Sequence, residues 1–316
     1  MSDPVSTNAI SGTPTSQPEW QAMADTLAIE GRAYVKGSYR WAVNGETFPS
    51  VSPMDGRELA QVASCDKADA DKAVAIARKV FERGDWRELA PAKRKAVLIR
   101  FAELIEAHGD ELALLDTLDM GKPISHARTV DVPATARAIR WTAEAIDKVY
   151  GELAPTPHNQ IGMISREPMG VVAAIVPWNF PMIMAAWKIA PALATGNSVI
   201  LKPSEKSPLT AIRLAALATE AGIPDGVFNV LPGFGHTVGK ALALHMDVDC
   251  LVFTGSTNVA KQLMVYAGQS NMKTGVAGGR RQEPQHRVCG CPGPEKSRRR
   301  SRQRHCLQPG RSLHRW

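Results

Sequence analysis

The sequence has few of the features that mark membrane, secreted or disulfide-rich proteins. It holds five cysteines in 316 residues, too few for a disulfide scaffold and in keeping with a reducing cytoplasm. It has no run of 18 apolar residues, so no membrane span is predicted. Residues 1–18 are polar and rich in Ser, Thr and Pro, without the basic start and apolar middle of a signal peptide. They are predicted to be disordered.

Charge is distributed unevenly along the chain. The whole sequence carries +7, but residues 274–316 hold 11 of the 38 basic residues and only 2 of the 31 acidic ones. That segment is therefore +9 and residues 1–273 are −2. The same segment has no Ile, Phe, Tyr or Met, although 44% of the whole chain is hydrophobic. These patterns predict a near-neutral globular body of one large or two smaller domains, followed by an aberrant basic tail from 274 to 316.

The first half of the chain has mainly helical patterns. Residues 20–29 predict a short helix, and 33–41 and 47–51 predict hairpin strands around a turn at Asn44-Gly45. Longer helices are predicted to begin at Asp66 and Pro91 and to cover 111–118 and 134–150. Their apolar stripes are interpreted as core packing. Residues 151–169 predict an extended, hairpin-like segment.

After this segment, short apolar runs alternate with helical patterns. The runs cover 171–176, 198–201, 227–231 and 250–253, and the helices that follow them cover 181–193, 208–221, 236–244 and 258–266. Continuous apolar strands that each precede a helix are typical of a parallel sheet buried on both faces. The predicted fold class is therefore α/β, with a Rossmann-like parallel sheet and an N-terminal helical segment. Ligands of such sheets bind at the carboxyl ends of the strands.

The first two strand ends carry polar groups suited to catalysis and ligand binding. Asn179 lies between Pro177 and Pro181, where a rigid carboxamide could donate hydrogen bonds to an oxyanion. For this motif alone, a turn stabilised by an Asx hydrogen bond is the simpler explanation. Lys202 and Glu205 follow the second strand. The lysine is a cation and the glutamate can accept hydrogen bonds from a ribose diol, but a solvated charge pair is the simpler alternative.

The other two strand ends have amide-rich helix starts. Gly233-Phe234-Gly235 with Gly239 forms a Gly-x-Gly-x-x-x-Gly pattern, which departs from the usual Gly-x-Gly-x-x-Gly. Glycines there let a phosphate approach the helix N-terminus. The segment from Thr254 to Ser256 precedes the last helix, where either pyrophosphate binding or simple helix capping fits.

Together the four strand ends resemble a known family. The segments IVPWNFP, LKPSE, PGFG and FTGS, in this order, are similar to those of the NAD-dependent aldehyde dehydrogenases over residues 20–273. The segments ERGDW, LDMGKP and AIRWTAEAIDKVYGE resemble the gamma-glutamyl-gamma-aminobutyraldehyde dehydrogenase branch of putrescine breakdown, with betaine aldehyde dehydrogenases as near neighbours.

The resemblance implies a role for each matching residue. Asn179 would be the oxyanion donor, and no metal is implied. NAD, with NADP as the alternative, would be bound by Ile175, Trp178, Lys202, Ser204, Glu205, Gly235, Gly239, Phe253, Gly255, Ser256 and Val259. Ala260 stands where many members have Gly. The resemblance also implies an NAD-binding domain over 29–150 and 170–273, preceded by a flexible segment and short helix over 1–28. It further implies a small aldehyde substrate, a cytoplasmic homo-oligomer and a bridging hairpin segment over 151–169.

The family's reaction also needs two residues that the sequence lacks in the expected place. A cysteine thiolate attacks the aldehyde, and a glutamate activates the water that hydrolyses the resulting thioester. The glutamate motif should follow soon after Lys273 and the cysteine motif further on, but neither is present. Gly278 and Leu313 occupy their registers. The catalytic domain is therefore predicted to be missing.

A shift of reading frame explains this tail. Codons chosen for 277–284 and 307–316 and read one base later give Leu-Glu-Ala-Gly-Gly-Lys-Ser-Pro and Phe-Asn-Gln-Gly-Glu-Val-Cys-Thr-Ala-Gly, the two missing motifs. We therefore predict a one-base insertion or two-base loss near the codon of Lys273, and a disordered, out-of-frame tail.

The same frame shift removes two other readings of the tail. A metal cluster at Cys289, Cys291, His305 and Cys306 lacks paired Cys-x-x-Cys spacing, and the nucleic-acid patch at 298–300 lies wholly within the shifted segment. Cys65 and Cys250 are expected in the core. Two hypotheses remain, which are an aldehyde dehydrogenase truncated before its catalytic elements and a non-catalytic NAD-binding or interaction fragment.

Overall fold

The chain folds around a largely parallel central sheet. The computed structural model describes residues 14 and 16–280. These residues divide into two compact units, one of which contains the described residues up to Val149 and from Pro168 to Gly279, and the other Tyr150–Glu167. In the first unit, seven strands form one sheet in the order β11-β10-β7-β8-β9-β1-β2.

The four predicted apolar runs form the middle of this sheet. They are β7 (Val171–Ile175), β8 (Ser198–Lys202), β9 (Phe228–Val230) and β10 (Cys250–Ser256). Strand β7 pairs in parallel with both β8 and β10, and β8 pairs in parallel with β9. The predicted α/β fold class is therefore confirmed, and the four strand ends lie side by side at one edge of the sheet.

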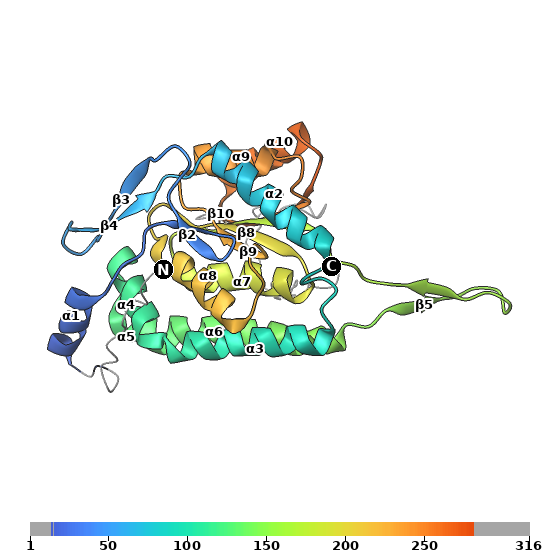
Figure 1. Ribbon diagram of the computed structural model, residues 1–316, viewed down its shortest axis with the longest axis horizontal. Helices are drawn as coiled ribbons and strands as arrows, with labels where there is room; N and C mark the ends of the chain where they lie inside the picture. The colour runs from blue at the N-terminus through green and yellow to red at the C-terminus, as the bar shows by residue number, and fades with distance from the viewer. Residues whose placement is uncertain (1–13, 15, 281–316) are drawn as a thin grey trace, which may run out of the picture. The chain divides into compact units, whose positions relative to one another are not determined.

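Helices cover both faces of the sheet. Figure 1 shows α2 (Lys67–Arg83), α9 (Lys240–Leu244) and α10 (Thr257–Gln269) on one face. On the other face lie α7 (Pro181–Ala194) and α8 (Leu209–Ala221), and α3 (Pro91–Ala107) and α6 (Val132–Ala145) pack outside them. A sheet covered in this way needs apolar side chains on both faces of each central strand.

The side chains of β7 show this directly. Because successive residues of a strand point to opposite faces, Val172 and Ala174 belong to the apolar core under α7 and α8, whereas Val171, Ala173 and Ile175 belong to the core under α2 and α9. All five are buried. The run is continuously apolar because this strand contributes side chains to two separate cores, one on each face of the sheet.

The long helices begin where the sequence predicts. The side chain of Asp66 caps α2 by accepting the N–H of Ala68 at 2.7 Å, and Pro91 occupies the first turn of α3. Helix α4 (Gly109–Met120) includes the predicted 111–118 segment, and α1 (Gln17–Thr26) begins and ends three residues before the predicted 20–29 helix. Helix α6 is preceded by α5 (Ile124–His126) and a π-helical turn, η1 (Ala127–Asp131), and is followed by a 3₁₀ turn, η2 (Ile146–Lys148).

The prediction of a hairpin around Asn44-Gly45 is wrong. Strand β1 (Ala33–Val35) pairs with β2 (Ser38–Arg40), and β3 (Thr47–Val51) pairs with β4 (Glu58–Ala63). The turn between β1 and β2 consists of Lys36 and Gly37, which both have positive φ, of 54° and 71°. Two such residues form the turn that matches the twist of a two-residue hairpin. Asn44-Gly45 still forms a turn, in which the N–H of Gly45 bonds the carbonyl of Ala42 at 3.0 Å, but it only connects β2 to β3.

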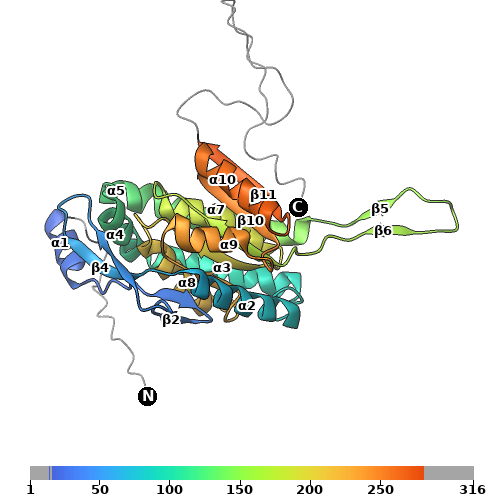
Figure 2. The same cartoon turned by 90° about the horizontal axis from the view of Figure 1, so that it is seen from above.

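The first residues of the predicted disordered tail are also ordered. Strand β11 (Thr274–Arg280) lies at the edge of the sheet beside β10. Figure 2 shows both strands next to α10. Pairing at a sheet edge uses backbone N–H and C=O groups that almost any sequence supplies, so a segment with atypical side chains can still add a strand. The rest of the predicted tail, 281–316, lies outside the described residues.

The second unit is a two-stranded hairpin, as predicted for 151–169. Strands β5 (Glu152–Ala154) and β6 (Gly162–Ile164) pair antiparallel, and Arg166 forms an ion pair with Glu152 at 2.5 Å. Leu153, Ile161 and Met163 are each more than 70% exposed. No helix in the described part of the chain is both long enough and apolar enough to span a membrane.

Candidate active site

The parallel strands bring the predicted site residues to one edge of the sheet. In the register, Ile175 stands opposite both Lys202 on β8 and Phe253 on β10, and Leu201 stands opposite Val230. The chain leaves each strand at this edge and enters a turn that leads to a helix. Each of the twelve predicted residues lies in one of these four strand ends, the turns after them or the first helical turn beyond.

Asn179 lies in a constrained turn after β7. The next residue, Phe180, has φ 84° and ψ 57°, the left-handed conformation that side chains other than Gly rarely adopt. The Oγ of Ser207 donates a hydrogen bond to the carbonyl oxygen of Trp178 at 3.1 Å, which ties this turn to the loop before α8. Asn179 is half-buried and Trp178 is 50% exposed. Such a turn can hold a carboxamide donor in a fixed direction.

Lys202 and Glu205 form an ion pair at the end of β8. Lys202 is 3% exposed, and its Nζ lies 3.2 Å from Oε2 of Glu205. Burial lowers the pKa of Lys202, although Glu205 opposes this shift. Burial by itself would raise the pKa of Glu205, but Lys202 and a backbone N–H outweigh it, so the pKa of that carboxyl is lowered. The pair therefore presents a carboxylate acceptor, about one-third exposed, that a buried cation orients.

Ser204 lies between these two residues in the sequence, and its hydroxyl already forms a hydrogen bond with a nearby backbone group. Its Oγ accepts the N–H of Lys206 at 3.2 Å, and the residue is 8% exposed. This hydrogen bond shapes the turn that presents Glu205.

The glycine pattern after β9 has two separate explanations. Gly233 has φ 140°, and a Cβ there would lie 2.8 Å from the carbonyl oxygen of Cys65, so its role is structural. Gly235 opens the π-helical turn η3 (Gly235–Gly239), and a Cβ there would meet no atom within 4 Å. Only Gly235 therefore faces open space, where a ligand could approach the backbone.

The helix start after β10 is capped by its own side chain. The Oγ of Ser256 accepts the N–H of Val259 at 3.3 Å, so the simpler capping interpretation holds for this residue. A Cβ at Gly255 would lie 2.4 Å from the ring of Phe253, which explains why this position has no side chain. Val259 is 45% exposed in the first turn of α10.

Neither cysteine in the described part of the chain is suited to attack an aldehyde. Cys65 and Cys250 are both buried, as expected. Burial raises the pKa of both thiols, to about 12 for Cys250. A buried, protonated thiol is inert because the thiolate is the nucleophile. Within 14 and 16–280, no cluster of three or more His, Cys, Asp or Glu could hold a metal ion.

Sequence reasoning missed a buried charged cluster behind the Asn179 turn. Lys122 lies over the ring of Phe180, with its Nζ 4.2 Å from the ring centroid. The same ammonium group is paired with Asp131 and lies 3.7 Å from Asp116. Burial, partly offset by Lys122, raises the pKa of Asp116 to about 8. The only sequence signal was the Gly121-Lys122-Pro123 segment, which places a lysine between two residues that restrict the backbone.

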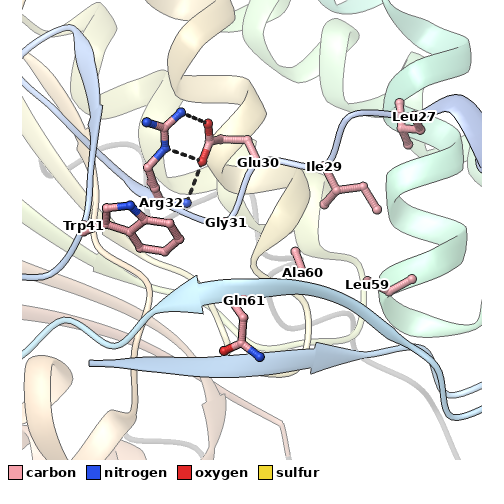
Figure 3. Close-up of a pocket in the computed structure, with 9 residues that line it drawn as sticks. All are labelled: Leu27, Ile29, Glu30, Gly31, Arg32, Trp41, Leu59, Ala60 and Gln61. Atoms are coloured by element: carbon pink, nitrogen blue, oxygen red, sulfur yellow. Dashed lines mark hydrogen bonds and ion pairs between the residues drawn. The ribbon is translucent and has the colours of Figure 1, made fainter. Parts of the chain in front are cut away.

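A separate hollow of about 460 Å³ lies between the segment before β1 and strand β4 (Figure 3). Arg32 and Glu30 form an ion pair on its wall, and the Nε of Arg32 donates to Oε1 of Glu30 at 2.9 Å. It is lined by Leu27, Ile29, Glu30, Gly31, Arg32, Trp41, Leu59, Ala60 and Gln61. None of these belongs to the predicted site, so this hollow is not the candidate active site.

Known proteins share this fold and sequence. Residues 41–279 match the family model described as the aldehyde dehydrogenase family. The chain is 60% identical over 254 residues to the NADP/NAD-dependent aldehyde dehydrogenase PuuC of Escherichia coli, an alignment that covers 80% of this chain and 51% of that protein.

Two solved structures are similarly close. One is the indole-3-acetaldehyde dehydrogenase AldA of P. syringae, a variant in complex with NAD⁺, with TM-score 0.83 and 65% identity over 84% of this chain and 54% of that one. The other is the gamma-glutamyl-gamma-aminobutyraldehyde dehydrogenase of Burkholderia cenocepacia, with TM-score 0.81 and 61% identity over 82% of this chain and 52% of that one. The chain spans about half the length of these relatives. It belongs to the aldehyde dehydrogenase family.

Proposed function

We propose that this chain is the NAD-binding half of an aldehyde dehydrogenase, and that it binds the dinucleotide without oxidising aldehydes. The observation that carries the proposal is the set of four parallel strand ends, which gathers the residues of all four motifs at one sheet edge. Ligands of parallel α/β sheets bind at this edge. The AldA structure solved with NAD⁺, which has the same fold at 65% identity, supports the choice of ligand.

The residues present fit a dinucleotide. The carboxylate of Glu205, oriented by Lys202, can accept the hydroxyl groups of the adenosine ribose. The open backbone at Gly235 and the amide-rich start of α10 near Ser256 can receive the pyrophosphate. NADP is the alternative, since the E. coli relative is named for both cofactors. When bound, the nicotinamide supplies the hydride acceptor.

The parent activity that we propose is the oxidation of an aminoaldehyde to the carboxylate. The name of the B. cenocepacia structure supports gamma-glutamyl-gamma-aminobutyraldehyde as the substrate type. In that reaction Asn179 would donate a hydrogen bond to the oxyanion that forms when a thiolate adds to the aldehyde. The half-buried carboxamide, in a turn fixed by the left-handed Phe180, suits this role.

The chain as written should not carry out this reaction. The shifted frame after Lys273 puts Leu313 and Gly278 in the registers of the nucleophile and the general base. The buried thiols Cys65 and Cys250 cannot replace the nucleophile. Both thiols are also unpaired, which supports a reducing, cytoplasmic location. The exposed apolar residues of the β5–β6 hairpin support its use in a homo-oligomer of the complete protein.

Calorimetric titration of the full chain with NAD⁺ tests the proposal. We expect measurable binding that falls by about 10- to 100-fold in Glu205→Ala, since hydrogen bonds to a charged group are worth about 1.5–3 kcal/mol. A matched control is Glu152→Ala, which removes an exposed carboxylate of the β5–β6 hairpin. If neither Glu205→Ala nor Lys202→Ala weakened NAD⁺ binding, the cofactor site would not be the one proposed.

Activity assays test the proposed loss of catalysis. We expect no NADH production with gamma-aminobutyraldehyde-type substrates, whereas a gene with its frame restored after codon 273 should produce NADH. Turnover by the chain as written, abolished by Cys65→Ala or Cys250→Ala, would contradict the proposed inactivity. Resequencing the gene across that codon distinguishes a frame shift that is present in the gene from a sequencing error in an ordinary enzyme. The alternative function is a non-catalytic NAD-binding or interaction fragment.

A further inference from the structure

Phe180 has a backbone conformation that must be held by its surroundings. Its φ of 84° lies in the left-handed region, and the next residue, Pro181, disfavours the right-handed helical region for it. Such conformations persist only where neighbouring contacts over-determine them. The carbonyl of Phe180 accepts the N–H of Met184 at 2.9 Å as the first hydrogen bond of α7. The position of Phe180 therefore links the start of α7 to the direction of Asn179.

Lys122 supplies a contact of this kind from a distant part of the chain. It follows Gly121, which has φ 74° and ends α4, and precedes Pro123, so its backbone is restricted on both sides. Its side chain is 8% exposed, and its Nζ lies 4.2 Å from the centroid of the Phe180 ring. A cation over an aromatic face is attracted by the ring, more strongly where water is excluded.

Two carboxyl groups hold this ammonium group in place. Asp131, the last residue of η1, is paired with Lys122, and the fully buried Asp116 on α4 lies 3.7 Å from its Nζ. Among the described residues, both oxygens of Asp116 and Oδ1 of Asp131 lack a hydrogen-bond partner, so the lysine is the main compensation for two buried carboxyl groups. An ammonium group held by these contacts cannot easily move off the ring.

We propose that Lys122 is a positioning residue for Asn179. Through the ring of Phe180 it holds the left-handed backbone conformation and so fixes the direction of the neighbouring carboxamide. The proposal rests on the proposed function, in which Asn179 is the oxyanion donor. Lys122 itself acts through Phe180 and contacts no reacting atom.

Nuclear magnetic resonance of the full chain, with ¹⁵N in its asparagine side chains, tests this. The Asn179 signals are assigned by their loss in Asn179→Asp. We expect Lys122→Met to shift them and to make the backbone amide of Met184, which bonds the Phe180 carbonyl, exchange about tenfold faster, as loss of a buried cation–π contact allows. Lys122→Arg, which keeps the cation, should lie closer to wild type in both measurements.

The matched control is Lys95→Met. Lys95 also bridges two carboxylates, Glu144 at 2.8 Å and Asp147 at 3.0 Å, but lies over no aromatic ring of the described residues. We expect it to leave the Asn179 signals unchanged. Unchanged Asn179 signals in a folded Lys122→Met, or equal shifts in the Met and Arg variants, would overturn the proposal.

A second variant covers the case in which Lys122→Met does not fold. Phe180→Leu removes the ring but keeps the lysine and both carboxyl groups, so it should reproduce the Asn179 shift. Unchanged Asn179 signals in Phe180→Leu would also overturn the proposal. A failure of NAD⁺ to bind the wild-type chain would instead remove the proposed function, and the Asn179 signals would still report on the role of Lys122.

Discussion

The turns after β7 and after β10 lie at neighbouring strand ends, yet different contacts hold them. The turn that carries Asn179 is contacted by Lys122 from the loop after α4 and by Ser207 from the loop before α8. The turn after β10 is held by its own sequence, through the Ser256 hydroxyl and the N–H of Val259 three residues later. The first turn should therefore respond to substitutions far away in the sequence, and the second only to local ones.

The largest expected effect is on the chemistry of the first turn. In a protein with its frame restored, Asn179→Ala should lower kcat by about 100- to 1000-fold, the usual loss for one oxyanion donor. Steady-state kinetics with an aminoaldehyde and NAD⁺ would measure it. Lys95→Met, on α3, is the control in the same protein and should leave kcat nearly unchanged. A near-normal rate for Asn179→Ala would remove this residue from the catalytic role.

The next effect concerns how stability depends on pH behind this turn. The pKa of Asp116 is raised by burial from its usual value near 4 to about 8, so the folded state keeps a proton that the unfolded state releases. The contribution of Asp116 to stability should therefore be largest below about pH 4 and be lost as the pH rises through about 8. Asp116→Asn cannot lose a proton, so it should flatten this slope.

Urea unfolding at several pH values from 5 to 9 measures the difference. We expect Asp116→Asn to be the more stable protein at pH 8, by on the order of 1–3 kcal/mol, because it removes the cost of ionising a fully buried carboxyl group. A residual slope should remain from Asp119, whose pKa burial raises to about 7. Equal slopes for Asp116→Asn and wild type would show that Asp116 is already ionised in the fold.

The contrast between the two turns also explains how much the sequence could predict. Periodicity located the four central strands and their helices, because a strand with two buried faces is apolar throughout, as at Ala173 and Ala174. Periodicity did not predict which strands pair where backbone geometry decides the pairing. The Lys36-Gly37 turn needs positive φ at a lysine, which no side-chain pattern reveals, whereas Asn44-Gly45 looked like a hairpin and was only a connection.

The candidate site divides in the same way. The helix cap at Ser256 could be predicted from the sequence, because its donor and acceptor are only three residues apart. The contacts of Lys122 could not be predicted from the sequence, because its partners, Asp131 on η1 and Phe180 before α7, meet it only after folding. The pairing of Lys202 with Glu205 was suggested by spacing, but the burial of the lysine followed only from the structure. Residue types at strand ends therefore predicted which residues meet at one edge of the sheet, and not the contacts that hold them.

The smallest expected effect tests the local turn. Ser256→Ala removes the side-chain cap of α10 and should lower the free energy of unfolding by about 1 kcal/mol, the usual cost of losing such a cap. Ser207→Ala should act across the molecule instead, because it removes the hydroxyl that bonds the Trp178 carbonyl. Urea unfolding gives the first quantity, and the Asn179 side-chain signals give the second. If Ser256→Ala moved the Asn179 signals as much as Ser207→Ala does, the two turns would be coupled, and the distinction between local and distant support would fail.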